Sequence, residues 1–349
     1  MKSKSIILLL ILTITSCNVF LGPEPDKSPK GIFDQIWNDV NETYALFRVK
    51  GIDWDAVYHK YSPLVTQNMA DYNLFIVCGN MMNELNDLHS FLRSPFGVSL
   101  YLYEDETDYG KPDYAFPSPP VLTDDGIYTG DGTGSYFYYG TFRDKPNVGY
   151  LYINDFLGFN ISLDVIPDWA KEIDGIVKYL LDTDALVIDI RNNGGGMGSN
   201  VDYIASRFIS QTYNYAVSRT KNGPGPNDFT DPVTWTIVPA GVRYTKRIIL
   251  LTNRETPSAA EWFTLALRNQ SHVIHMGEKT AGGMSARIVR PLINGWAYTL
   301  SVQEVQAGDG NFYDGVGIPP HVELLGDYIN WKKVLDYALG VIFPPDMGS

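Results

Sequence analysis

The spacing of hydrophobic residues divides the chain into two parts. Between residues 31 and 90 apolar residues recur at helical spacing, as in GIFDQIWNDVNETYALF. A repeat of about 3.6 residues predicts amphipathic helices there. From residue 149 onward, apolar runs without alternation, such as ALVIDI and RIILLT, are separated by helical patterns. Buried strands that alternate with helices predict a parallel sheet with crossover helices, and therefore an α/β fold.

These patterns also predict how the chain is organised. We expect a small helical domain over residues 31–94, followed by an α/β core over residues 95–340. The first part of the core, residues 95–146, is rich in tyrosine and glycine and is predicted to form short strands and loops. Residues 18–30 contain prolines and polar residues, and we interpret them as a tether.

The segment from Met1 to Cys17 has the pattern of an export signal. Two lysines precede an apolar run over residues 6–12, which is too short to span a membrane. The stretch ITSC that ends at Cys17 resembles a bacterial lipobox, so we expect Cys17 to be lipidated. The protein would then be anchored in the cell envelope, as a periplasmic or outer-membrane lipoprotein. A plain signal peptide with a coincidental cysteine is the alternative.

Charge and cysteine content exclude several classes of partner. The 349 residues carry a formal net charge of −13 and no cluster of Lys and Arg, which argues against nucleic acid as a ligand. Besides Cys17 the chain contains only Cys78, within the apolar run LFIVCGNMMNEL. We interpret Cys78 as a core residue. No spacing of Cys and His typical of a zinc site occurs.

Two predicted strand-to-helix junctions carry the candidate chemistry. In DIRNNGGGMGSN, three glycines follow a buried strand and leave their N–H groups free to face an anion. In TNRETPSAAE, Ser258 opens a helix, whose N-terminus offers unpaired N–H groups and a partial positive charge. Ser258 is therefore a candidate nucleophile, and the N–H groups of Ala259 and of Gly194 or Gly195 are a candidate oxyanion hole. A helix cap and a tight turn are the alternatives.

In combination, these stretches resemble a known family. LVIDIRNNGGG, PSAAE, GEKTAGG and YDGVGIPPH are similar to motifs of the C-terminal processing peptidases, or tail-specific proteases, of peptidase family S41. The resemblance covers roughly residues 75–325. It implies a ClpP/crotonase-like core and a serine peptidase that acts by acyl transfer on peptides or unfolded proteins. It implies no metal and no cofactor.

The sequence departs from that family in two places. Members with a Ser/Lys dyad carry the lysine at the position that Gly283 occupies in this chain, and Lys279 lies before that position. The segment between Ser90 and Gly149 is too short to hold the PDZ domain of those members in addition to the strands of the core. Both departures resemble the tricorn-like branch, whose N-terminal helical region this chain also resembles.

The resemblance to that branch implies the remaining site residues. His89, in LNDLHS, matches the histidine that serves there as general base, and Asp314 occupies the place of its acidic partner. Glu261, one helical turn after Ser258, and Ser90 are secondary candidates. An inactive protein that binds peptides or apolar ligands on the same fold is the main alternative, and an esterase that uses the same serine is another.

Overall fold

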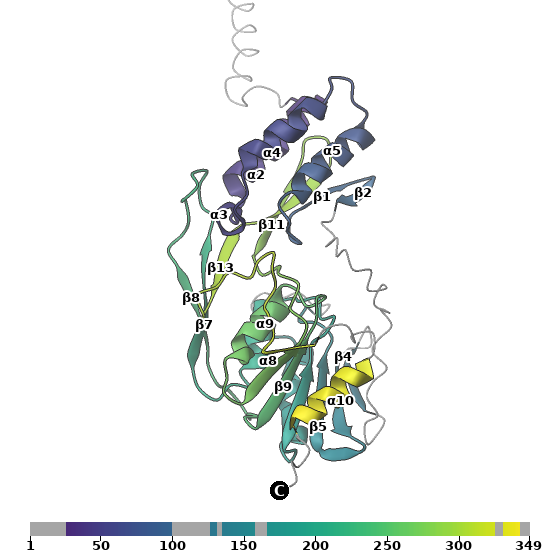
Figure 1. Cartoon of the computed structure of the whole chain (residues 1–349), viewed down its shortest axis with the longest axis vertical. Coiled ribbons are helices and arrows are strands. Elements are labelled where there is room, and N and C mark those ends of the chain that lie inside the picture. The colour runs from purple at the N-terminus through teal and green to yellow at the C-terminus, as the bar shows by residue number, and fades with distance from the viewer. Residues whose placement is uncertain (1–25, 100–125, 131–134, 158–165, 325–330, 343–349) are drawn as a thin grey trace, which may run out of the picture.

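The structure is a computed structural model that describes residues 26–99, 126–130, 135–157, 166–324 and 331–342 (Figure 1). The expected signal segment, Cys17 and most of the predicted tether lie outside these residues. Within the described part of the chain, no helix combines the length and the apolar character needed to cross a membrane.

The larger sheet forms the centre of the α/β core. Its strands follow the order β14–β10–β9–β6–β5–β4–β3. The strands from β5 to β14 pair in parallel, whereas β3 and β4 are antiparallel additions at one edge. This confirms the predicted parallel sheet. The bounds are β3 (Ile127–Gly130), β4 (Ser135–Phe142), β5 (Lys145–Ile153), β6 (Ala185–Asp189), β9 (Arg247–Thr252), β10 (Val273–Gly277) and β14 (Val322–Glu323).

Helices cover both faces of this sheet, which explains the unbroken apolar runs. Successive residues of a strand point to opposite faces. Leu186 and Ile188 therefore pack with α7, α8 and α9, while Val187 packs on the other face with α10. The predicted helix after residue 167 is divided in two at Glu172. The bounds are α6 (Asp168–Lys171), α7 (Ile173–Leu180), α8 (Gly198–Ala205), α9 (Ala259–Arg268) and α10 (Trp331–Ile342).

The N-terminal helices pack against a separate small sheet. Its order is β11–β12–β1–β2, so two strands from late in the chain join two early ones. Residues 287–301, which were expected in the core segment, thus lie with the helical region and share its hydrophobic cluster. The bounds are α2 (Pro29–Thr43), α3 (Phe47–Lys50), α4 (Trp54–Tyr61), η1 (Ser62–Leu64), α5 (Asp71–Asn83), β1 (Phe91–Ser94), β2 (Gly97–Ser99), β11 (Arg287–Pro291) and β12 (Ala297–Ser301).

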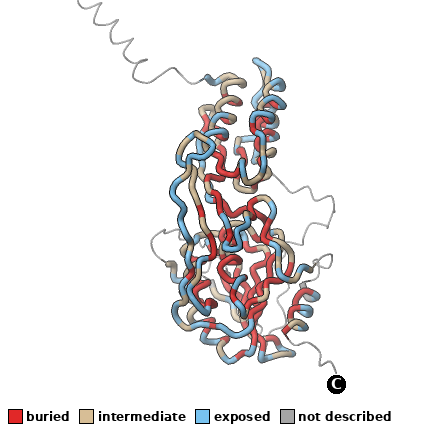
Figure 2. Tube along the Cα trace, turned by 60° about the vertical axis from the view of Figure 1, so that its left-hand side comes forward, coloured by how far each residue is buried: buried red, intermediate tan, exposed pale blue. Residues whose placement is uncertain are grey.

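A third sheet lies beside the N-terminal region and the core. It consists of β7 (Tyr213–Thr220), β8 (Val233–Ile237) and β13 (Gln303–Ala307) in the order β13–β7–β8. The carboxylate of Glu304, only 2% exposed, accepts hydrogen bonds from Arg219 and from Arg48 of α3. Figure 2 shows buried residues continuing from the core into the helical region, so the two parts share an interior.

Candidate active site

The two junctions singled out in the sequence lie side by side because their strands are neighbours. β6 and β9 pair in parallel, and parallel strands deliver the following loops to the same edge of a sheet. Two asparagines join the loops. The Asn192 N–H donates to Asn253 Oδ1 over 3.0 Å, and Asn253 Nδ2 donates to Asn192 Oδ1 over 2.6 Å.

A buried ion pair holds the start of the glycine loop. Arg191 Nε and Nη2 donate to the two carboxylate oxygens of Asp189 over 2.9 and 2.6 Å, and Tyr150 Oη donates to Asp189 Oδ2 over 2.9 Å. The Asp189 side chain is completely buried. Bidentate geometry of this kind orients both groups. Asp189 and Arg191 are therefore structural supports of the loop.

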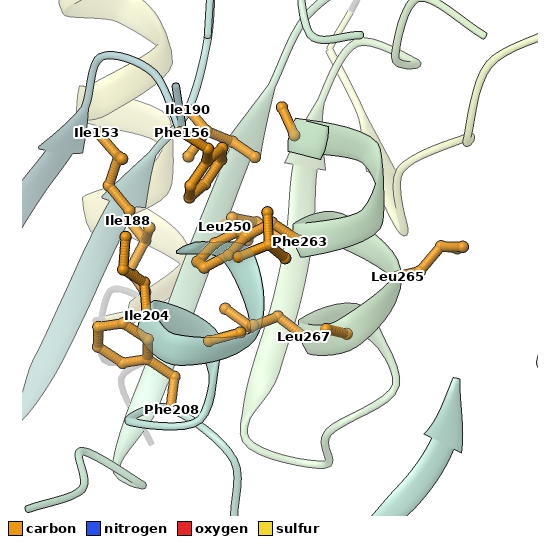
Figure 3. Packing of buried hydrophobic residues seen from close by; sticks show 14 of the residues in the cluster. Ile153, Phe156, Ile188, Ile190, Ile204, Phe208, Leu250, Phe263, Leu265 and Leu267 are labelled. Carbon is orange, nitrogen blue, oxygen red and sulfur yellow. The ribbon is translucent and has the colours of Figure 1, made fainter. Parts of the chain in front are cut away.

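The hydrophobic core supports the two loops from below. Phe156 and Phe263 pack with ring centroids 5.1 Å apart, under the first turn of α9 (Figure 3). The backbone of Phe156 also holds the glycine loop, since its N–H donates to the Gly195 carbonyl over 2.8 Å. A Cβ on Gly196 would lie 2.1 Å from the Phe156 carbonyl carbon, so only glycine fits there. The loop is thus fixed by backbone contacts.

Ser258 occupies a backbone conformation that glycine would prefer. Its φ of 60° and ψ of −127° match the first central position of a type II′ turn. Gly195 lies directly behind it, because a Cβ on Gly195 would come within 2.8 Å of Ser258 Cβ and 3.0 Å of the Ala259 nitrogen. The side chain of Ser258 is partly exposed at the N-terminus of α9. This is the position of an accessible, strained serine.

The expected oxyanion donors differ in their availability. The Gly195 N–H donates to Asn193 Oδ1 over 2.9 Å, so it is already engaged. Within the described residues the N–H groups of Gly194 and Ala259 have no hydrogen-bond partner, and a Cβ on Gly194 would meet no atom within 4 Å. Gly194 and Ala259 are therefore the donors available to an anion.

Glu261 fastens the candidate nucleophile to the loop that follows β10. Its completely buried carboxylate accepts from the N–H of Ser258 (3.0 Å), Gly282 (2.8 Å) and Gly283 (2.7 Å), and from Thr280 Oγ1 (2.5 Å). Burial raises the pKa of Glu261 to about 7, and the four donors oppose this rise. Glu261 therefore positions two segments at once.

His89, in the turn between α5 and β1, contacts the far end of that loop, and its ring orientation is defined. Its Nδ1 lies 2.6 Å from the carbonyl oxygen of Ser285. A carbonyl can only accept, so Nδ1 carries the proton and Nε2 is left as an acceptor. A Cβ on Gly283 would lie 3.9 Å from His89 Nε2. His89 Nε2 thus lies beside Gly283. The N–H groups of Gly283 and Ser258 both donate to the Glu261 carboxylate.

Electrostatics keep this imidazole neutral. Burial lowers the pKa of His89 below its ordinary value, and the charges of Arg287 and Lys50 lower it further. The Asp87 carboxylate and the Ser285 carbonyl oppose these effects without cancelling them. A neutral imidazole with a free Nε2 can accept a proton near neutral pH.

Asp314 supports His89 indirectly. No hydrogen bond joins the two side chains in the described structure. Instead, Asp314 Oδ1 accepts from the N–H groups of Met284 and Ser285, both over 2.9 Å, and the Ser285 carbonyl accepts from the ring. Burial, together with the Asp87 carboxylate, raises the pKa of Asp314 to about 8. The sequence pointed to this residue but not to the backbone link.

The other candidates take structural places. Ser90 Oγ donates to Asp87 Oδ2 over 2.8 Å and accepts from the Ser301 N–H over 3.1 Å, so it joins the turn before β1 to the end of β12. Lys279 makes no hydrogen bond with the site in the described part of the chain. Cys78 is buried in the helical region, and burial raises the pKa of its thiol to about 12.

Sequence reasoning missed two supports of the site. Asn193 engages the Gly195 N–H, and the Asn-Gly-Gly order was a usable signal because asparagine side chains bond to the backbone two residues on. The other is Ser285, whose carbonyl orients the ring of His89. A backbone acceptor leaves no signal in the residue type.

Comparisons with known proteins agree with this geometry. Residues 147–324, just over half of the chain, match the model of peptidase family S41. The chain belongs to peptidase family S41. Residues 25–83 match the tricorn protease C1 domain, in agreement with the resemblance of the helical region.

Proteins similar to this chain are distant in sequence, and solved structures among them are close in fold. The carboxy-terminal processing protease CtpB of Bacillus subtilis (strain 168) is 25% identical over 178 residues, which are 51% of this chain and 34% of that protein. The chain thus spans about a third of that relative. A candidate peptidase from Parabacteroides merdae ATCC 43184 is 28% identical with a TM-score of 0.76, covering 91% of this chain and 98% of that one. Mature CPAF in complex with lactacystin has the same fold. It is 14% identical, with a TM-score of 0.70, and the match covers 90% of this chain and 98% of that one.

The predicted fold class is confirmed by these neighbours. They share the mixed α/β core with its parallel sheet, and the small helical region precedes it as expected.

Proposed function

We propose that this S41 protein is a serine peptidase that cleaves peptides or unfolded proteins by acyl transfer. The observation that carries the proposal is the orientation of His89. Its Nδ1–H is committed to the Ser285 carbonyl, which leaves Nε2 as a base beside the loop that Glu261 ties to Ser258.

In the proposed reaction, Ser258 Oγ attacks the substrate carbonyl and His89 Nε2 takes its proton. The negative charge on the carbonyl oxygen is stabilised by the N–H groups of Gly194 and Ala259, each worth about 3 kcal/mol. The imidazolium then donates the proton to the leaving amine, and the acyl group stays on Ser258 Oγ as an ester. Water, which gives a proton to His89, attacks this ester, and the imidazolium returns the proton to Ser258 as the acid product leaves. Asp314 holds the Ser285 peptide group in place throughout.

The protein would act at a membrane. Lipidation of Cys17 and export by residues 1–17 are parts of the proposal that rest on the sequence alone. They would place the peptidase in the cell envelope, as a periplasmic or outer-membrane lipoprotein. Metabolic labelling with an alkyne-tagged fatty acid, with Cys17→Ser as control, tests this part.

Covalent labelling with a fluorophosphonate, read by intact mass, tests the proposed chemistry. We expect the wild type to be labelled once and Ser258→Ala not at all. His89→Gln should be labelled about 100- to 10,000-fold more slowly, the usual contribution of a general base. His272→Gln is the matched control, because His272 binds the Phe208 carbonyl away from the site. A folded wild type that takes no label would favour the inactive binding protein instead.

The labelling rate should stay high in mildly acidic solution. His89 acts as a base only when neutral, so the rate falls as the pH drops through its pKa. Because burial lowers that pKa, the midpoint of this fall should lie below pH 6.5, the ordinary value for histidine. A midpoint at or above pH 7 would contradict the assigned environment of the ring. Intact-mass time courses between pH 4.5 and 8 would measure it.

A further inference from the structure

A lysine that has no part in the proposed reaction lies behind the candidate base. Lys50 is the last residue of α3 and is partly buried. Its Nζ donates to the carbonyl oxygens of Leu85 over 3.2 Å and Asn86 over 2.6 Å. Burial lowers the pKa of Lys50, and the carboxylates of Asp87 and Asp314 oppose this by favouring the charged form. An ammonium in such a place is retained only where acceptors and opposite charges compensate its lost hydration.

One contact of Lys50 reaches the backbone that carries His89. Asn86 has a φ of +46°, which is uncommon for a residue other than glycine. The hydrogen bond from Lys50 holds its carbonyl in that turn. The next residue, Asp87, then accepts the His89 N–H through Oδ1 over 2.9 Å. Lys50 thus fixes the turn that determines where the main chain of His89 lies.

A second contact reaches the support of the His89 ring. A Cβ on Gly315 would lie 3.1 Å from Lys50 Cε and 3.3 Å from its Nζ, so the lysine packs directly on this glycine. The preceding residue, Asp314, binds the N–H of Ser285, whose carbonyl binds His89 Nδ1. Lys50 therefore contacts both the turn that holds the main chain of His89 and the glycine next to Asp314, which supports the His89 ring through Ser285.

Charge points to the same role. Two carboxylates, Asp87 and Asp314, are buried within reach of each other, and their repulsion is one reason why the pKa of Asp314 is raised. Although burial opposes ionisation of Asp87, the Lys50 ammonium and the His89 ring help to hold the pKa of Asp87 below its ordinary value. The hydroxyl of Tyr44 completes this cluster and is uncharged, because burial raises its pKa well above the ordinary range.

We propose that Lys50 is a positioning residue for His89. It holds the strained turn at residues 85–87 by two hydrogen bonds and supplies a positive charge close to the Asp87 carboxylate, next to the base. The expected effect of Lys50 on the labelling rate rests on the proposed function. Its expected effect on the pKa of the His89 ring rests on the described contacts alone.

Three substitutions separate the two contributions of Lys50. Lys50→Met removes the donors and the charge, Lys50→Gln keeps donors without charge, and Lys50→Arg keeps both. We expect Lys50→Met to be labelled by the fluorophosphonate about 10- to 100-fold more slowly, the effect of a small displacement of a reacting group. In the Met and Gln variants the acid midpoint of the rate should move to higher pH, because a positive charge near His89 is lost. Lys50→Arg should keep the wild-type midpoint.

Arg48→Met is the matched control, since Arg48 is a cation of the same short helix but binds Glu304 away from the turn. It should lower stability without moving the midpoint. If Lys50→Met does not fold, Lys50→Gln carries the test. The proposal is overturned if a folded Met or Gln variant keeps both the wild-type rate and midpoint, or if Arg48→Met shifts the midpoint equally.

A second readout keeps this inference apart from the proposed function. The His89 ring proton signal, assigned by its loss in His89→Gln, can be titrated by NMR without any reaction. Its pKa should rise in Lys50→Gln and stay unchanged in Arg48→Met. If the wild type takes no label, the proposed function fails, and the titration still decides the role of Lys50. An unmoved His89 titration in Lys50→Gln would overturn that role.

Discussion

Ser258→Gly is expected to be more stable than the wild type and to have lost its reactivity. The serine is held at a φ of 60° and a ψ of −127°, which costs a residue with a Cβ about 1–3 kcal/mol. Glycine removes that strain but has more freedom to lose on folding, about 0.5–1 kcal/mol. The net expected gain is about 1 kcal/mol in the free energy of unfolding. Loss of the hydroxyl should lower turnover by about four to six orders of magnitude.

Ser258→Ala is the matched variant, because it removes the same oxygen and keeps the Cβ. It should lose as much turnover as Ser258→Gly and remain close to the wild type in stability. Urea denaturation and hydrolysis of an unfolded protein substrate would measure the two properties. Equal stability of the Gly and Ala variants would show that the backbone of Ser258 is not strained. Turnover by a well-folded Ala variant would remove Ser258 as the nucleophile.

The opposition between stability and reactivity at Ser258 has a structural reason. The serine must be presented at the start of α9, next to two unpaired N–H groups, while its backbone is packed against Gly195. A relaxed conformation would rotate the hydroxyl away from the groups that it has to meet. The strained backbone conformation of Ser258 is maintained by Glu261, by the glycine loop and by the core below them.

The parallel sheet could be predicted because its cause is local. Strands covered on both faces need apolar residues at every position, and ALVIDI and RIILLT show this directly. The proximity of the two junctions followed from the same reasoning, since neighbouring parallel strands deliver their loops to one edge. The sequence also indicated Ser258 and His89, although the histidine came from a resemblance and not from a pattern.

The pairing that places His89 could not be predicted in this way. β1, from the first third of the chain, pairs with β12, from its last fifth. The other neighbour of β12 is β11, which is largely exposed and carries two arginines. Neither β1 nor β11 has the apolar run that would reveal a partner. Pairing between such distant segments depends on the whole fold, and residues 287–301 were therefore expected in the core.

Details of hydrogen bonding were also beyond the sequence. Glycines 194 and 195 looked equivalent as oxyanion donors, and only the side chain of Asn193 separates them. Asp314 was expected to assist His89, and the structure links the two only through the peptide group of Ser285. Lys50 gave no signal at all, because one lysine at the end of a short helix is common on protein surfaces.

The missing dyad lysine has a structural explanation. The sequence has glycine at position 283, where a Ser/Lys member would carry its base. A Cβ at that position would point into the space beside His89 Nε2, 3.9 Å away. A lysine side chain there and the histidine from the N-terminal region would therefore compete for one place. In the proposed mechanism, His89 would take the place that the resemblance gives to the dyad lysine.

The largest expected effect on stability is that of Glu261→Ala. Removal of the carboxylate leaves four donors without an acceptor: three buried ones from Thr280, Gly282 and Gly283, and the partly buried N–H of Ser258. Loss of one member of such a network typically costs about 3–5 kcal/mol. The same change frees Ser258 from the loop that leads to His89, so the labelling rate of the folded molecules should also fall. The stability and labelling rate of Glu261→Gln should lie between those of the wild type and Glu261→Ala, because its amide oxygen replaces only one of the two carboxylate oxygens.

Glu304→Ala is the control for burial alone. Glu304 is nearly as buried as Glu261 and is held by two arginines, but it contacts neither Ser258 nor His89. We expect a similar loss in the free energy of unfolding and an unchanged labelling rate for each folded molecule. If Glu261→Ala retained wild-type labelling once folded, Glu261 would be a stabilising residue only. The nucleophile and the base would then have to be aligned by the core beneath them, through the packing of Phe156 against Phe263.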